Sequence, residues 1–246
     1  MTGKIGTRYG KHHDLAKRPK PAPITTCYIC GEPLGDRPTN RDHIPPDQIL
    51  PASIRRKYAI NFVTRKVHLA CNDSFKLDEE YFVHCLIPFA PGTEAGDAIW
   101  RKAVTEYRAG KNRPLVNLVL SQAKERVGDV YLPPDKVALD YDLDRFERVV
   151  SKIVRGLYFC ETETVIDPST SMTVFVIPPG NDPPDHYKEM LKHPAESKGN
   201  HQGVFAYWYV AFDSGVHYWA LLLWDKVIIT AIFKVDPPPA ADATEP

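Results

Sequence analysis

Two short stretches decide the fold: Cys27-Tyr-Ile-Cys30-Gly31 and His68-Leu-Ala-Cys71, with 37 residues between Cys30 and His68. Each stretch pairs two soft or borderline metal ligands at the same internal spacing, and Cys₃His sets commonly hold tetrahedral zinc. Gly31 permits the tight turn of a zinc knuckle. The gap between the pairs can hold a hairpin and a loop. We therefore predict a closed structural Zn²⁺ site formed by Cys27, Cys30, His68 and Cys71.

Cysteine usage and hydropathy indicate the compartment. The chain of 246 residues has 5 cysteines, an odd number, and its N-terminus has no apolar leader segment. This pattern favours a reducing, cytoplasmic location and metal ligation over disulfides. A thiol redox pair at Cys27 and Cys30 is the weaker alternative. The longest apolar run, from Trp219 to Trp224, is broken by Asp225 too early to span a bilayer, so no membrane association is expected.

Three residues near the zinc ligands are not needed for zinc: Asp42, His43 and Asn72. The Asp42 carboxylate and the Asn72 amide oxygen suit Mg²⁺ or Mn²⁺, and the His43 imidazole can act as a general base. Neighbouring side chains on a strand point to opposite faces, so Asp42 and His43 share a site only if the strand ends or bulges there, as Pro45-Pro46 suggests. The set predicts phosphodiester hydrolysis, with the ion held on the scissile phosphate.

These residues also resemble a known family. Cys27-x-x-Cys30, Asp42-His43-Ile44-Pro45-Pro46, Asn61 and Cys71-Asn72-x-x-x-Lys76 are similar to the HNH, or ββα-metal, endonucleases, and closest to a zinc-knuckle subgroup of bacterial and phage proteins. The resemblance covers residues 24–86, with a faint continuation at 152–158. It implies His43 as general base, Asp42 and Asn72 as ligands of the catalytic ion, and Asn61 as the residue that orients the histidine loop. It also implies a β-hairpin carrying Asp42 and His43, and a helix beginning near Asn72.

Charged side chains around this site allow two interpretations. The acidic run 78–80 could lend Glu79 or Glu80 to the ion, but a solvated helix face is the favoured interpretation. Basic residues near the site could neutralise phosphates or form a solvated loop. Residues 1–85 carry more basic than acidic side chains, which is compatible with a polyanionic partner. The candidate nucleic-acid contacts are Arg55, Arg56, Lys57, Arg65, Lys66 and Lys76.

Composition, hydrophobic periodicity and the resemblance together predict an α+β chain in five parts. Residues 1–23 form a basic arm, 24–88 the zinc-stabilised HNH module, 89–160 a helical connector, 161–235 an antiparallel β-rich domain, and 236–246 a polar tail. One helix is expected at residues 75–86, two helices at 97–128, and a further helix at 143–159. Strands are expected at 172–177, 204–212, 216–224 and 227–233, the last three as a meander.

The aromatic side chains of the β-rich part could form a base-stacking platform, but a small sheet core is favoured. This domain could serve targeting, homodimerisation or binding of a partner protein. The leading hypothesis is a metal-dependent HNH endonuclease acting on nucleic acid, with DNA favoured, that uses structural Zn²⁺ and catalytic Mg²⁺ or Mn²⁺. The alternative is an inactive, zinc-stabilised module that binds nucleic acid or protein.

Overall fold

The computed structural model describes residues 25–134, 137–180, 185, 188, 197–199 and 201–235. The expected basic arm at 1–23 and tail at 236–246 lie outside these residues. The chain is mixed α+β and has a four-stranded antiparallel sheet in its C-terminal part, which confirms the predicted fold class at this level. None of the helices in the described part combines the length and apolar character needed to cross a membrane.

A two-stranded antiparallel ribbon carries the N-terminal motifs. Strand β1 (Thr39–Ile44) pairs with β2 (Val63–His68), and the register runs without a bulge from Thr39 opposite His68 to Ile44 opposite Val63. Between them lie a 3-10 turn, η2 (Asp47–Ile49), and the short helix α1 (Ala52–Tyr58). After β2 come α2 (Leu69–Asp73), α3 (Lys76–Leu86) and the 3-10 turn η3 (Ile87–Phe89).

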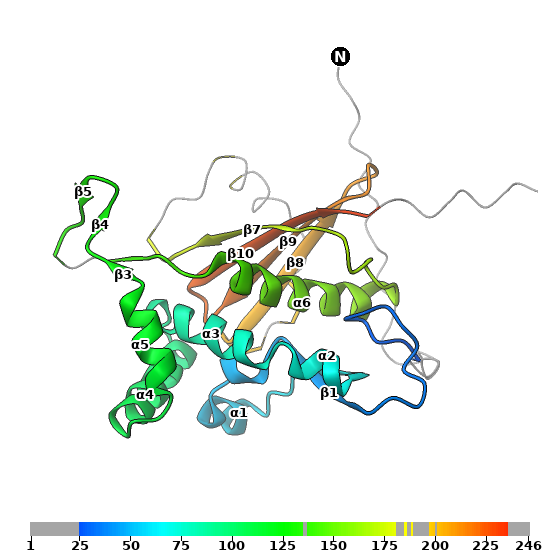
Figure 1. Cartoon of the computed structure of the whole chain (residues 1–246), viewed down its shortest axis with the longest axis horizontal. Coiled ribbons are helices and arrows are strands. Elements are labelled where there is room, and N and C mark those ends of the chain that lie inside the picture. Colours follow the sequence, from blue (N-terminus) through cyan, green and yellow to red (C-terminus); the bar gives the residue numbers. More distant parts are fainter. Residues whose placement is uncertain are drawn as a thin grey trace, which may run out of the picture.

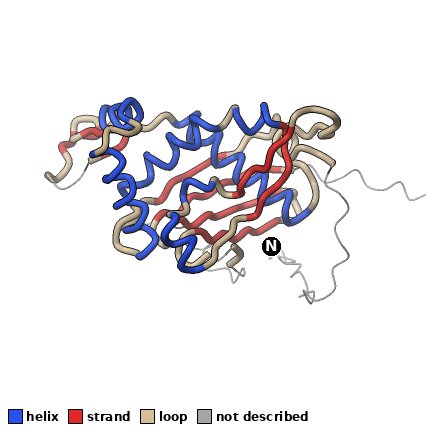
Figure 2. The backbone as a smooth tube through the Cα atoms, turned by 90° about the horizontal axis from the view of Figure 1, so that it is seen from below, coloured by secondary structure: helices blue, strands red, loops and turns tan. Residues whose placement is uncertain are grey.

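Two further helices follow, α4 (Glu94–Arg108) and α5 (Arg113–Ser121), and they gather at one end of the molecule (Figures 1 and 2). The second was expected to continue to Gly128, but it ends at Ser121. The next residues form short antiparallel pairs: β3 (Ala123–Lys124) with β6 (Ala138–Leu139), and β4 (Arg126–Val127) with β5 (Val130–Tyr131). Gly128, at φ +56°, begins the turn between β4 and β5, a conformation typical of hairpin glycines.

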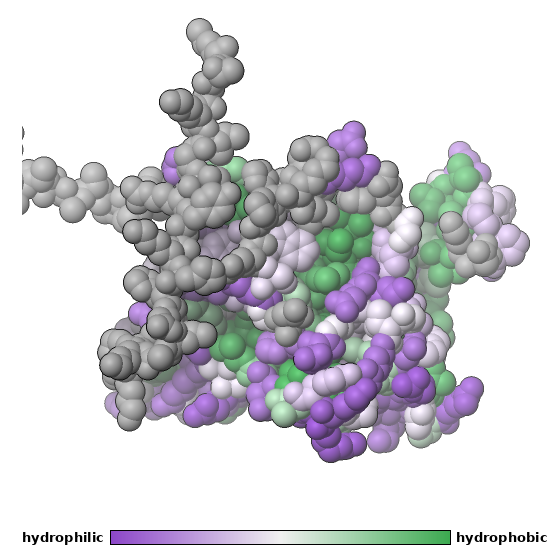
Figure 3. Space-filling view, turned by 180° about the vertical axis from the view of Figure 1, so that it is seen from behind, coloured by the Kyte–Doolittle hydropathy of each residue, from purple (hydrophilic) through white to green (hydrophobic). Residues whose placement is uncertain are grey.

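The β4–β5 hairpin projects from the body and exposes apolar side chains (Figure 3). Val127, Val130 and Tyr131 are 58%, 68% and 74% exposed.

Helix α6 (Leu143–Thr162) is the central element of the fold. It lies in front of the sheet (Figure 1), whose strands have the order β7 (Thr173–Ile177), β10 (Val227–Lys234), β9 (Val216–Leu223), β8 (Phe205–Ala211). All four strands and the meander were predicted. The helix also packs against α3 and β1, so the segment expected as a connector joins the motif-bearing part to the sheet.

One large hydrophobic cluster, from Cys27 to Phe233, joins the N-terminal part, α4, α6 and the sheet. Two hydrogen bonds tie Trp224, in the turn between β9 and β10, to earlier parts of the chain. The Trp224 indole N–H donates to the Ile49 carbonyl at 2.9 Å, and the Thr93 hydroxyl donates to the Trp224 carbonyl at 2.9 Å. The aromatic side chains of β8 and β9 contribute to this core: Trp219 is fully buried and stacks on Tyr209, with ring centroids 4.4 Å apart. The burial of these aromatic side chains therefore fits the interpretation that they form the core of the sheet.

Candidate functional site

The first cysteine pair lies on a tight turn. The Gly31 amide donates to the Cys27 carbonyl at 2.8 Å, and the Cys27 amide donates to the Glu32 carbonyl at 2.9 Å. Gly31 has φ +78°, a value that a side chain at this position would disfavour. The turn therefore holds the thiols of Cys27 and Cys30 on the same side of the chain.

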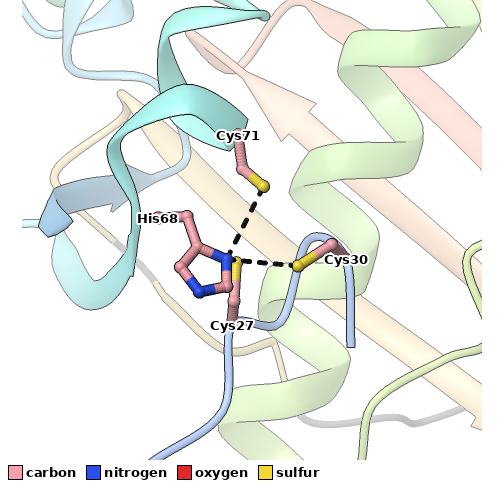
Figure 4. A group of neighbouring side chains, drawn as sticks. All are labelled: Cys27, Cys30, His68 and Cys71. Atoms are coloured by element: carbon pink, nitrogen blue, oxygen red, sulfur yellow. Dashed lines mark hydrogen bonds between the residues drawn. The ribbon is translucent and has the colours of Figure 1, made fainter. Parts of the chain in front are cut away.

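The second pair lies where β2 meets α2. His68 is the last residue of β2 and caps α2, and Cys71 follows one turn later. The His68 Nδ1 atom lies 3.3 Å from the Cys30 sulfur and 3.9 Å from the Cys71 sulfur, and the four side chains point toward one another (Figure 4). All four ligand atoms lie within 4.8 Å of one another.

This cluster could hold a metal ion, and its donors fit zinc. A tetrahedron with Zn–S bonds of about 2.3 Å has edges of roughly 3.8 Å, close to the observed spacing. The His68 Nε2 atom lies 3.1 Å from the Pro33 carbonyl oxygen, so a proton on Nε2 would leave Nδ1 free to bind a metal, an arrangement usual for ligating histidines. Burial, followed by the charge of Cys27, raises the pKa of the Cys71 thiol to about 12. A divalent cation among such thiols would oppose this shift.

A second polar cluster lies beside the first and is centred on Lys152 of α6. The Lys152 ammonium donates to Asp42 Oδ1 at 2.8 Å, to Asn72 Oδ1 at 3.0 Å and to Glu79 Oε1 at 2.6 Å. Its side chain is only 2% exposed. The structure thus brings Asp42 and Asn72 together, as the sequence predicted, but around an ammonium group.

Helix α6 approaches β1 closely enough to deliver this lysine. A Cβ atom added at Gly156 would lie 2.7 Å from Ile44 Cδ1, so only glycine fits here without a shift. Arg155 fixes the neighbouring loop, because its guanidinium donates to the carbonyls of residues 166, 167, 168 and 170. The close approach at Gly156 places the helix against the ribbon, and Arg155 holds the loop that follows the helix.

Tyr28, inside the cysteine knuckle, connects the two clusters. Its hydroxyl donates to Asp42 Oδ2, and both carboxylate oxygens of Asp42 therefore have partners. Burial, then the charge of Asp42, raises the pKa of Tyr28 well above its ordinary value. The phenol consequently stays protonated and acts as a donor.

The acidic run 78–80 is not the solvated face that was favoured from the sequence. Glu79 is buried on Lys152, and Asp78 forms ion pairs with Arg145 and Arg148 of α6. Burial raises the pKa of Glu79, and the Lys152 ammonium offsets part of that shift. The prediction failed because of tertiary packing. The polar face of α3 is covered by α6, and the sequence of α3 alone does not show this.

His43 does not share the site with Asp42. Because β1 pairs regularly through Ile44, alternate side chains point to opposite faces, and Asp42 is buried while the His43 side chain is 40% exposed. The expectation that the strand end would let both residues face one site is therefore wrong. The His43 Nε2 atom lies 3.9 Å from Asp47 Oδ1.

Asn61 lies exposed in the segment just before β2. Its side chain makes no hydrogen bond with any residue that the structure describes, so its orienting role stays a prediction.

The candidate nucleic-acid contacts separate into groups. Arg55 pairs with Asp47 and Lys57 with Glu94. Arg65 is half-buried, on the same face of the ribbon as Asp42. Arg56, Lys66 and Lys76 are exposed and form no ion pair within the described ranges.

The observed geometry does not fit the expected Mg²⁺ or Mn²⁺. Such an ion needs several oxygen ligands directed at it. Both oxygens of Asp42 are already bonded, and the oxygens of Asn72 and Glu79 that converge here accept from Lys152. Moreover, the cationic ammonium lies where the ion would be, and two cations at one point repel.

Tyr28, Glu79 and Lys152 form this cluster together with the predicted residues, and sequence reasoning did not place Tyr28 or Lys152 in a site. The available signal was a lysine in the helix 143–159 next to the apolar positions Ile153 and Val154. A buried lysine needs a carboxylate partner, but the sequence does not show which one.

No family model, curated protein or solved structure matches this chain.

Proposed function

We propose that this chain is a nucleic-acid-binding protein built on a zinc-stabilised module of HNH type. The observation that carries the proposal is the ribbon face opposite Asp42. Arg41, His43, Thr64 and Lys66 share this face by register, and Arg41 and Lys66 are exposed. Asp42, Tyr28 and Lys152 are buried on the other face, so the outer face is the one that a polyanion can reach.

Zinc has a structural role in this proposal. Bound at Cys27, Cys30, His68 and Cys71, it would join the knuckle to the junction of β2 and α2 and so hold the ribbon rigid. A rigid ribbon fixes the spacing of its basic side chains, as phosphate contacts require. The side chain of Arg41 already bonds Thr64 across the ribbon at 3.4 Å.

The test is binding of labelled DNA and RNA duplexes, followed by fluorescence anisotropy at several salt concentrations. Arg41→Ala with Lys66→Ala should weaken binding and reduce the salt slope by about 2, since each lost phosphate contact contributes roughly 0.9. The matched control is Lys124→Ala with Arg126→Ala, which removes the same charge from the β3–β4 region. If both double variants lost the same amount of affinity, the effect would come from net charge alone. That result would overturn the proposed surface.

The second candidate function is the endonuclease expected from the sequence, with His43 as general base. One observation favours it: His43 is accessible on the basic ribbon face, next to a carboxylate that could orient its imidazole. Asp42 and Asn72 would be the ligands of Mg²⁺ or Mn²⁺ only if Lys152 moved away.

Plasmid cleavage distinguishes these functions. The wild type and His43→Ala are assayed with EDTA, Mg²⁺ and Mn²⁺. Cleavage by the wild type that His43→Ala abolishes selects the enzyme. If both proteins bind the plasmid equally and neither cleaves it, the binding module is selected.

A further inference from the structure

Three oxygen donors converge on one point in the interior. They come from three separate elements: Asp42 from β1, Asn72 from α2 and Glu79 from α3. The Lys152 ammonium at that point has three protons and three acceptors, at 2.6 to 3.0 Å. A lysine ammonium has three donors, so its hydrogen-bonding capacity is saturated here.

The charges at this point are those of a cation site. Two carboxylates face each other across the ammonium, and the Tyr28 hydroxyl supports one of them. Without a cation, two buried carboxylates would repel each other and lose hydration, which is costly. Either an ammonium or a divalent ion would relieve this cost, but not both in the same place.

We propose that Lys152 is the resident cation of the Asp42–Asn72–Glu79 site and keeps Mg²⁺ and Mn²⁺ out of it. The site is therefore a divalent-cation site closed by the protein's own side chain, and removal of the ammonium opens it. This inference does not depend on the proposed nucleic-acid binding, because metal binding at the site is measured without nucleic acid.

The surroundings permit such an exchange. A cavity of about 390 Å³ lies beside the site, with Lys152, Tyr28, Phe75 and Arg148 among its lining residues. An ion could reach the oxygens through this cavity once the ammonium is gone. The Arg148 guanidinium lies over the Phe75 ring, 4.1 Å from its centroid, and bonds Ser74 and Asp78, so it is held away from the three oxygens by its own partners.

The experiment measures Mn²⁺ binding by electron paramagnetic resonance to zinc-loaded full-length protein. Wild type, Lys152→Met and the double variant Lys152→Met with Glu79→Gln are compared. Methionine keeps most of the lysine volume but brings no charge. We expect Lys152→Met to bind one Mn²⁺ per chain at least about tenfold more tightly than the wild type, a difference of about 1.4 kcal/mol, and the double variant to lose that gain.

Two results would overturn the proposal. One is Mn²⁺ binding by the wild type that Asp42→Asn abolishes, because Lys152 would then fail to exclude the ion. The other is a folded, zinc-loaded Lys152→Met protein that binds Mn²⁺ no better than the wild type. If Lys152→Met does not fold, the wild-type titration decides by itself: Asp42-dependent binding contradicts the proposal, and its absence supports it.

Discussion

Two clusters of metal-ligand type lie side by side in this molecule, and they solve the same electrostatic problem differently. The cysteine cluster gathers three thiols and an imidazole, with no protein cation among its members. The oxygen cluster gathers two carboxylates and an amide around Lys152. Both link the β1–β2 ribbon to helices. The difference teaches that a set of converging donors indicates an external metal only where no basic side chain of the chain itself reaches the centre.

The largest effect is expected at the cysteine cluster. Cys71→Ser should abolish stoichiometric zinc and unfold the N-terminal part, since structural zinc contributes roughly 10 kcal/mol or more to the folding of small zinc domains. Zinc analysis with thermal unfolding measures this. Cys160→Ser, a part-buried cysteine outside the cluster, is the control and should keep its zinc. An unchanged melting temperature of the Cys71→Ser protein would show that the cluster has no structural role.

Removing one partner from the oxygen cluster should lower the free energy of unfolding, whether or not metal is added. Asp42→Ala leaves the Tyr28 hydroxyl without its acceptor and the Lys152 ammonium with one carboxylate, and should cost about 3–5 kcal/mol of unfolding free energy. Asp47→Ala, which removes a half-exposed carboxylate paired with Arg55, should cost less than about 1 kcal/mol. Urea unfolding of both proteins tests the contrast, and similar costs would show that the cluster is not energetically coupled.

A third prediction concerns the contact that brings Lys152 to the ribbon. Gly156→Ala places a methyl group 2.7 Å from Ile44 Cδ1, and overpacking of this kind costs about 1–3 kcal/mol. Combining it with Ile44→Val removes the nearest of the three Ile44 atoms in conflict, leaves Cγ1 at 2.9 Å and Cγ2 at 3.2 Å, and should recover part of the loss, which a double-mutant cycle measures. Strictly additive costs would mean that α6 does not depend on this close approach.

The smallest expected effect is a difference in pH dependence. Burial raises the folded-state pKa of Glu79 above its ordinary value. Its contribution to stability is therefore fully present below the ordinary glutamate pKa of 4.5, and is lost as pH rises through the folded pKa. The stability of the wild type relative to Glu79→Gln should thus decrease from pH 4 to pH 7, by at most about 1.4 kcal/mol per pH unit. Chemical unfolding at several pH values measures this, and the opposite slope would show that Lys152 outweighs burial.

The local patterns of the sequence were sufficient for much of this fold. The sheet strands follow from β-branched and aromatic runs separated by Asp-Ser-Gly and Asp-Lys, and α6 from its apolar repeat. The cysteine cluster also follows, because each ligand pair is set by a short spacing on one turn. Asp42 and Asn72 were placed together for the same reason, since the cluster joins the segments that carry them.

Only the tertiary structure decided what those two residues face. Lys152 is 110 positions from Asp42 along the chain, and it reaches the carboxylate because α6 packs on the ribbon at Gly156. The side to which His43 points was likewise decided by the register of β1 with β2. The sequence by itself determined the donors, because short spacings and periodicity are local properties. The partner of those donors depended on the packing of distant elements, which no local spacing encodes.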